Sequence, residues 1–191
     1  MQPGTMPQYA IVAFPESDAA DVIEDLRSRY DPLAGLIPAH ITLVFPFSDD
    51  GLAAELNAIT RDAMNGIGPI EIELERVTEA DDGYVFLGVG LGRDRLVELH
   101  DSLYRGRLSI HRSRTHIYLP HVTIGRLADA DARQAAVAHA GRTLRPTHAT
   151  VRRLSVFRLD SPSRGQTISS IEFDHGLARQ SRPTPDEPRS R

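Results

Sequence analysis

The sequence predicts an α+β protein built from two copies of one β-α-β-α-β unit. Apolar runs of strand length alternate with longer segments of helical periodicity, and the order of these segments recurs about 80 residues further along the chain. The two halves cover residues 8–79 and 83–158, and a further strand is expected at 166–174. We expect a single bilobed domain over 8–175, in which two antiparallel-rich sheets face a central cleft.

The first half starts with an apolar strand, and Ser17 is a suitable N-cap for the helix that follows. In its last strand, Ile70, Ile72 and Leu74 alternate with glutamates, which is the pattern of a half-buried strand. The elements expected in this half are a strand at 8–14, a helix at 17–30, a strand containing His40, a helix at 50–65 and a strand at 70–78.

The second half repeats this order. Leu96, Leu99 and Leu103 mark one face of its first helix, and alanine dominates the second. We expect a flexible N-terminus over 1–7 and a disordered, proline-rich tail over 176–191. The elements expected in between are a strand at 84–90, a helix at 93–108, a strand containing His121, a helix at 129–141 and strands at 150–158 and 167–173.

The composition excludes several kinds of catalysis. The chain of 191 residues contains no cysteine, which rules out disulfides, thiolate zinc sites and cysteine nucleophiles. It also contains no lysine, because all 22 Lys and Arg positions are arginine, and this rules out the lysine–AMP chemistry of ATP-driven ligases. We see no run of about 18 apolar residues and no signal peptide, and we therefore expect a cytoplasmic protein without a membrane partner.

The charge distribution favours a phosphorylated ligand over duplex DNA. The net charge is −4, which argues against a surface coated for binding duplex DNA. Arginines nevertheless concentrate in the second half, because residues 102–128 hold five and residues 132–159 hold six, and neither segment contains an acidic residue. We expect one side of the molecule to be positive enough to attract a phosphate.

Two four-residue segments of the same form occupy matching places in the two halves, 40–43 (HITL) and 121–124 (HVTI). In each segment one apolar residue separates a histidine from a threonine. Side chains two residues apart lie on the same face of a strand, so each histidine shares a face with its threonine. Two imidazoles and two hydroxyls would then meet in one cleft. The predicted catalytic residues are His40, Thr42, His121 and Thr123.

These residue types suit acid–base chemistry on a phosphodiester. Histidine titrates near neutral pH, so one imidazole can accept a proton while the other donates one. In-line displacement at phosphorus needs a base at the incoming oxygen and an acid at the leaving oxygen, and threonine hydroxyls can hydrogen-bond the non-bridging oxygens. This scheme requires neither a metal nor a cofactor. The sequence does not assign which histidine is the base.

The paired segments, their separation of 81 residues (121 − 40), the duplicated pattern and the HVTIGR form of the second copy resemble the two-histidine (2H) phosphoesterase superfamily. Within it, the chain is most similar to the bacterial 2′-5′ RNA ligase-like and cyclic phosphodiesterase branch, from Gln8 to about His175. The resemblance implies a metal-independent 2′,3′-cyclic phosphodiesterase, reversible as a 2′-5′ RNA ligase. Its partners would be RNA with a 2′,3′-cyclic phosphate or small cyclic nucleotides, with the histidines as acid and base and the threonines on the phosphate.

Further residues are candidates for substrate binding. Arg126 follows the second motif at a place where relatives often carry a basic residue, and it fits either a phosphate contact or a strand end. Base stacking needs an exposed aromatic side chain near the cleft, and each aromatic candidate also fits a place in the core. The candidates for guiding RNA phosphates are Arg112 and Arg114, and those for base stacking are Phe47, Phe86, Tyr118 and Phe157.

Two other readings of the motifs stay open. The cleft could bind a phosphorylated nucleotide or RNA end without turning it over, since the residues needed are the same. A metal site on His40 and His121 is a third reading, weakened by the absence of a carboxylate near either motif. The other six histidines have no assigned role, and we expect His100 to be solvated on its helix. A monomer is the default oligomeric state.

Overall fold

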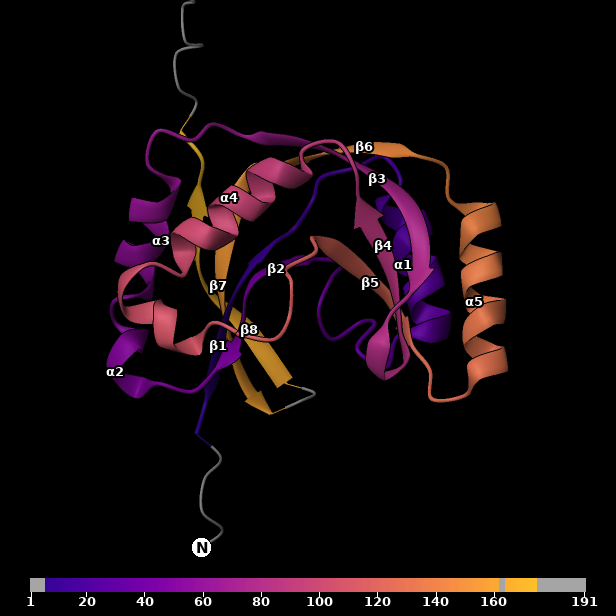
Figure 1. Ribbon diagram of the computed structural model, residues 1–191, viewed down its shortest axis with the longest axis horizontal. Helices are drawn as coiled ribbons and strands as arrows, with labels where there is room; N and C mark the ends of the chain where they lie inside the picture. Colours follow the sequence, from indigo (N-terminus) through magenta and orange to yellow (C-terminus); the bar gives the residue numbers. More distant parts are fainter. Residues whose placement is uncertain (1–5, 162–163, 175–191) are drawn as a thin grey trace, which may run out of the picture.

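The computed structural model describes residues 6–161 and 164–174, so the tail predicted at 176–191 and most of the predicted N-terminal segment lie outside the described residues. Within these ranges the chain forms one antiparallel sheet that curls into a half-barrel (Figure 1). The strands are β1 (Gln8–Ala13), β2 (Ile41–Phe47), β3 (Ile70–Glu79), β4 (Tyr84–Val89), β5 (His121–Arg126), β6 (Thr147–Val151), β7 (Arg153–Ser161) and β8 (Arg164–Glu172). The helices are α1 (Ala20–Tyr30), α2 (Asp50–Ala53), α3 (Leu56–Met64), α4 (Arg93–Leu103) and α5 (Ala130–Thr143), with short 3-10 turns η1 (Asp81–Gly83) and η2 (Gly106–His111).

The order of the strands places the two motif strands at the centre of the sheet. It runs β6-β3-β4-β5-β2-β1-β7-β8. The ladder between β2 and β5 consists of one residue pair, Ile41 opposite Val122, which we call the β2–β5 seam. The expectation of two separate sheets is therefore wrong, because the four strands on each side of the seam belong to one continuous sheet. The α+β class is confirmed.

Helices cover one face of each half of the sheet. Helix α1 packs on β5 and α5 packs on β3 and β4, whereas α4 packs on β2 and α3 lies against β7 and β8. Figure 1 shows α1 and α5 together on one side of the molecule, and α3 and α4 on the other. The alternation predicted for β3 is confirmed, since Ile70, Ile72 and Leu74 are buried in the core. No helix in the described part of the chain has the length and apolar character needed to cross a membrane.

Three of the predicted helices differ from the observed ones at their ends. The helix expected at 17–30 begins at Ala20. The helix expected at 50–65 is two helices, and the interruption is hidden in the sequence because Leu52 and Leu56, four residues apart, are both buried on either side of it. The helix expected at 93–108 ends at Leu103, because Gly106 takes a positive φ of 60° and opens a 3-10 turn.

The strand expected at 150–158 is two strands in different halves of the sheet. Strand β6 pairs with β3, whereas β7 pairs with β1, and Arg152 lies between them. No glycine or proline marks the change, but two adjacent arginines, Arg152 and Arg153, interrupt the apolar alternation there, and the buried positions resume at Leu154. The last strand begins at Arg164 rather than at 166.

Candidate active site

The seam brings the two motifs together. His40 directly precedes β2, and His121 is the first residue of β5. The strands are antiparallel and Ile41 lies opposite Val122, so continuing this register by one residue on each side sets Thr42 opposite His121 and His40 opposite Thr123. Ile41 and Val122 are buried on the other face of the sheet, as the alternation predicts. The two histidines and two threonines therefore share one face across the seam.

Each imidazole is held by a backbone carbonyl two residues upstream. Nδ1 of His40 lies 2.8 Å from the carbonyl oxygen of Pro38, and Nδ1 of His121 lies 2.6 Å from that of Leu119. A carbonyl oxygen only accepts, so Nδ1 must carry the proton in both rings. Nε2 is then the nitrogen left to accept or donate a proton, which fixes the same tautomer at both sites.

The surroundings of both histidines favour the neutral imidazole. Burial lowers the pKa of His40 and of His121 below the ordinary value of 6.5, and the two backbone carbonyls oppose this in part. The positive charge that His40 carries when protonated lowers the pKa of His121 further, so the charge on one imidazole acts on the other.

An aromatic ring accompanies each histidine. The ring of Phe86 stacks on His121 with centroids 3.5 Å apart and an interplanar angle of 22°. Phe14 approaches His40 more loosely, edge-on at 6.2 Å. Phe86 is one of the aromatic residues considered for base stacking, and the structure places one face of its ring against the imidazole instead. Its role here is to cover one face of His121 and limit the rotation of that ring.

A buried ionic cluster on α1 supports the segment that leads into the first motif. Arg27 is 1% exposed and donates to the carboxylate of Asp31 at 2.8 Å, to that of Glu24 at 2.9 Å and to the carbonyl oxygen of Ile37 at 3.0 Å. Glu24 also accepts a hydrogen bond from the backbone amide of Ala39. The residue before the first histidine is therefore tied directly to the helix, which limits where that histidine can lie.

Side chains from outside the sheet bond the backbone of β2 just beyond the seam. The ladder with β5 stops after one pair, so the following peptide groups of β2 need other partners. We call the three residues that supply them the β2 clamp. The bonds run from Tyr118 Oη to Thr42 O at 3.0 Å, from His100 Nδ1 to Leu43 O at 2.7 Å and from Phe45 N to Tyr104 Oη at 3.0 Å.

The members of the β2 clamp also pack on one another. The rings of His100 and Tyr118 are stacked with centroids 3.8 Å apart and nearly parallel, and Tyr104 lies 4.8 Å from His100. His100 is 4% exposed, which corrects the expectation that it is solvated, and burial lowers its pKa. In the sequence, His100 lies on a helix beside Asp101, and nothing in this pattern indicates that it bonds the backbone of β2. Only the packing of α4 on β2 brings the histidine to a strand carbonyl.

The predicted substrate-binding residues fall into different places. Arg126 is exposed at the end of β5, with its guanidinium 4.9 Å from the ring centre of Tyr84. Arg112 is exposed and bonds Asp101 at 2.6 Å, and Arg114 is exposed in the segment that leads to β5. These positions leave all three arginines accessible to a ligand.

Phe47 and Phe157 are candidates for base stacking that the structure corrects, because both rings are buried. Phe47 is 6% exposed, stacks on His111 at 4.5 Å and contacts Tyr9, so its ring belongs to the core and offers no surface to a base. It faces the core because it pairs with Tyr9 on the helix-covered side of the sheet. Phe157 is equally inaccessible, 6% exposed in a small cluster with Ala10 and Val12.

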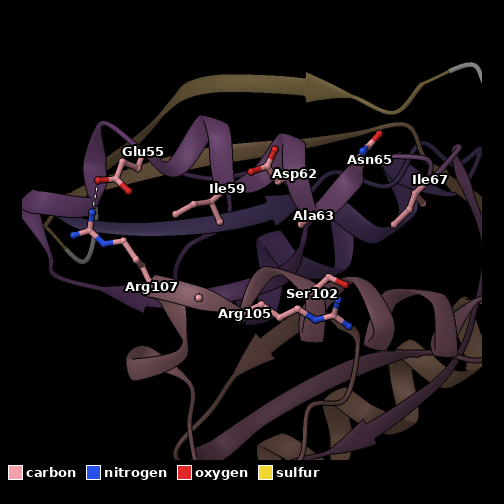
Figure 2. Close-up of a pocket in the computed structure, with 10 residues that line it drawn as sticks. Glu55, Ile59, Asp62, Ala63, Asn65, Ile67, Ser102, Arg105 and Arg107 are labelled. Carbon is pink, nitrogen blue, oxygen red and sulfur yellow. Dashed lines mark hydrogen bonds and ion pairs between the residues drawn. The ribbon is translucent and has the colours of Figure 1, made fainter.

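A separate hollow lies between α3, α4 and the segment that follows α4. It has a volume of about 510 Å³ and is lined by ten residues, among them Ile59, Asn65 and Arg105 (Figure 2). Glu55 and Arg107 form an ion pair at one end of it. None of the motif residues lines this hollow. In the described ranges no group of three His, Cys, Asp or Glu side chains is arranged to hold a metal ion.

A curled antiparallel sheet that carries two facing His-x-Thr pairs defines the class of 2H phosphoesterases. Comparison with known families agrees with this class. The chain belongs to the 2′-5′ RNA ligase superfamily, whose profile matches residues 14–162.

Bacterial relatives carry the provisional name phosphoesterase. A protein of Bacillus licheniformis is 28% identical over 127 residues, which cover 65% of this chain and 73% of the relative. A protein of Geobacillus kaustophilus is 32% identical over 126 residues, covering 62% of this chain and 69% of the relative.

Solved structures of E. coli LigT share the fold. The structure of LigT complexed with NADP+ has a TM-score of 0.60 at 16% identity and covers 87% of this chain and 98% of its own. LigT complexed with 3′-AMP has a TM-score of 0.57 at 17% identity, with the same coverage. The curled sheet with helices against each half is therefore the LigT fold.

Proposed function

We propose that this protein is a metal-independent 2′,3′-cyclic phosphodiesterase that acts on RNA ends or cyclic nucleotides, and that with a ribose hydroxyl in place of water as the attacking group it is a reversible 2′-5′ RNA ligase. The observation that carries the proposal is the arrangement across the seam. Continuing the register from Ile41 opposite Val122 sets each imidazole opposite a threonine of the other motif, and both imidazoles have the same tautomer. A phosphate placed over the seam has a histidine on each side and two hydroxyl donors beneath it.

The chemistry needs both histidines in different protonation states. The neutral imidazole takes a proton from the attacking water through Nε2, while the protonated one gives its proton to the leaving ribose oxygen. Thr42 and Thr123 donate hydrogen bonds to the non-bridging oxygens, on which negative charge is held during displacement. In ligation a ribose 5′-hydroxyl replaces water as the attacking group, and the same neutral imidazole accepts its proton while the other protonates the leaving ribose oxygen. The two histidines exchange roles when the 2′-5′ linkage is cleaved back to the cyclic phosphate.

The comparisons support a nucleotide as the class of ligand. Structures of LigT contain phosphate and 3′-AMP, and the second is the kind of product that opening a 2′,3′-cyclic phosphate yields. The superfamily to which the chain belongs is named for 2′-5′ RNA ligation. Both points favour an RNA terminus or a nucleoside cyclic phosphate over other phosphodiesters.

The direct test uses purified protein in EDTA with the four nucleoside 2′,3′-cyclic phosphates and a short RNA that ends in a cyclic phosphate. We expect wild-type turnover and a loss of roughly 10²–10⁴-fold in kcat for His40→Ala and for His121→Ala, the usual worth of a positioned acid or base. His148→Ala, on β6 outside the site, is the control and should keep full activity.

Turnover that persists in His121→Ala would refute the acid–base pair. A cyclic nucleotide that binds stoichiometrically but is recovered intact would identify a binding module instead. Activity that disappears in EDTA and returns with a divalent cation would refute the metal-independent scheme.

A further inference from the structure

The row of residues that contains His121 continues onto the neighbouring strands. The registers place Arg76 of β3 opposite Gly88 of β4, and Gly88 opposite His121 of β5. Directly paired residues of an antiparallel sheet present their side chains on the same face. Arg76, Gly88 and His121 therefore lie in one line on the face that carries the motifs, with Thr42 next in the row.

Gly88 leaves the space between the arginine and the histidine open. A Cβ atom built on Gly88 meets only the backbone oxygen of Arg76, at an ordinary contact distance of 3.6 Å. Neighbouring strands lie about 4.8 Å apart, so Arg76 and His121 are about two strand spacings from each other. An arginine side chain that extends over Gly88 can reach the space beside the imidazole.

Arg76 has the exposure and charge of a ligand-binding residue. Its side chain is exposed, and no carboxylate of the described residues lies within 4 Å of its guanidinium. Its chain neighbour Glu75 lies against Gly90, where a built Cβ would approach the carboxylate to 2.6 Å. The carboxylate of Glu75 thus lies beside Gly90, two residues beyond Gly88 and just after the end of β4, and the space over Gly88 itself stays open.

The two halves of this face differ in chemical character. On the β3–β5 side it carries Arg76 and Arg126, whose partner in the register is Tyr84. On the β1–β7 side the residues in line with Thr42 are Val12 and then Ser155, and the apolar residues Ala10 and Phe157 lie two positions further along these strands. A second negative group on a ligand bound at the seam is favoured toward Arg76 and Arg126, away from the carboxylate of Glu75 beside Gly90.

We propose that Arg76 forms a subsite for a second phosphate of the substrate, adjacent to the phosphate that reacts. This inference rests on the proposed function, because it takes the reacting phosphate to lie over the seam. The guanidinium then holds a phosphate displaced toward β3, across the gap left by Gly88. The subsite selects nucleotides that carry a further phosphate, such as an RNA terminus, over nucleosides that carry the reacting phosphate alone.

The test compares the binding of two named probes by calorimetry, adenosine 3′-monophosphate and adenosine 3′,5′-bisphosphate. We expect the wild type to bind the bisphosphate at least about tenfold more tightly, the scale of one hydrogen bond between charged groups. Arg76→Gln should abolish this preference without changing the affinity for the monophosphate, and Arg76→Lys should restore part of it. Arg142→Gln, on the exposed side of α5, is the matched control and should bind as the wild type does.

A second variant tests the open path. Gly88→Val fills the gap with a residue that suits a strand, and it should reduce the preference for the bisphosphate while Arg76 is intact. Equal binding of the two probes by the wild type, or an unchanged preference in Arg76→Gln, would overturn the subsite and leave the proposed function standing. Failure of the wild type to bind either probe would overturn both.

Discussion

His40 and His121 reach the same geometry through the same local device, a hydrogen bond from Nδ1 to a carbonyl two residues earlier. Their surroundings differ. His40 lies within the field of Arg27, Glu24 and Asp31, whereas the other charge that acts on His121 is His40 itself. The two motifs are therefore alike in sequence and unlike in the charges that surround their histidines.

The pH dependence of activity follows from these shifts. The pKa of both histidines is lowered from 6.5, so the state with one shared proton is most populated below pH 6.5. We expect a bell-shaped profile of kcat/KM, which reports the free enzyme, with its maximum on the acidic side of pH 6.5. Initial rates on a nucleoside 2′,3′-cyclic phosphate between pH 4.5 and 9, in buffers of constant ionic strength, measure this profile. A maximum above pH 7.5 would contradict the assignment.

At the residue scale, the sequence was sufficient to predict that the motif residues share one face of their strands. It was insufficient to predict which other residues contact them. The two-residue period of a strand predicts which side chains share a face, so the four motif residues could be named in advance. Phe86 and His100 reach the site through cross-strand and helix–strand contacts. Such contacts depend on register, and one sequence does not specify which residues of two strands lie opposite each other.

Strand β2 is the element on which the site depends most. One of its neighbours, β5, pairs with it at a single position, and the β2 clamp bonds the peptide groups that follow. Side-chain hydrogen bonds thus replace the backbone hydrogen bonds that β5 would otherwise make with this part of β2. The carbonyl of Thr42 is held by Tyr118, which belongs to the segment between α4 and β5. This segment carries Arg112 and Arg114, and it is connected to the site by the hydrogen bond of Tyr118.

Removing one hydroxyl from the β2 clamp tests this dependence. In Tyr118→Phe the carbonyl of Thr42 loses its partner, and we expect a loss of about 1 kcal/mol in the free energy of unfolding and a several-fold lower kcat with KM little changed. Tyr104→Phe is the matched control, since its hydroxyl bonds the more distant Phe45. We expect it to cost similar stability with a smaller loss of kcat, so equal losses of kcat would argue against a specific effect on Thr42.

At the element scale, the helices and strands were predictable where the apolar period is uninterrupted. The strand at 70–78 and the helix at 129–141 are found with small changes at their ends, as β3 and α5. The failures occur between α2 and α3 and between β6 and β7. In the first case the buried Leu52 and Leu56 keep the helical spacing across the break, so the break leaves no mark. In the second case Arg152 and Arg153 do interrupt the apolar alternation, and the strand predicted at 150–158 ran across them.

For the whole molecule, three partly or fully buried histidines link folding to pH. Burial lowers the pKa of His40, His100 and His121 in the folded protein. The unfolded chain therefore binds more protons as the pH falls below 6.5, and stability that is fully present above this pH is lost on acidification. We expect the free energy of unfolding to fall by up to about 1.4 kcal/mol per pH unit for each histidine in this range.

Urea denaturation at pH 7.5, 6.5, 5.5 and 5.0 measures this decline. His100→Gln removes one of the three titrating groups and keeps an amide that can donate to Leu43, so its stability should depend less steeply on pH than that of the wild type. Identical slopes for the two proteins would show that His100 does not contribute.

The topology of the sheet was the least predictable feature of the whole molecule. The repeated order of elements indicates two similar halves, and it does not say whether their strands form two sheets or one. That outcome is decided by a single pair of residues at the seam, Ile41 and Val122. Ile41 and Val122 are aliphatic residues like others in their strands, so the sequence does not indicate that these two form the pair.

The same pair has a mechanical consequence. Two rigid plates joined along a short edge rotate about that edge, and points close to the axis hardly move while the far rims swing widely. His40 and His121 are the immediate neighbours of the joint, so any rotation of the two four-stranded halves about it would change the distance between the imidazoles less than the distance between the outer strands.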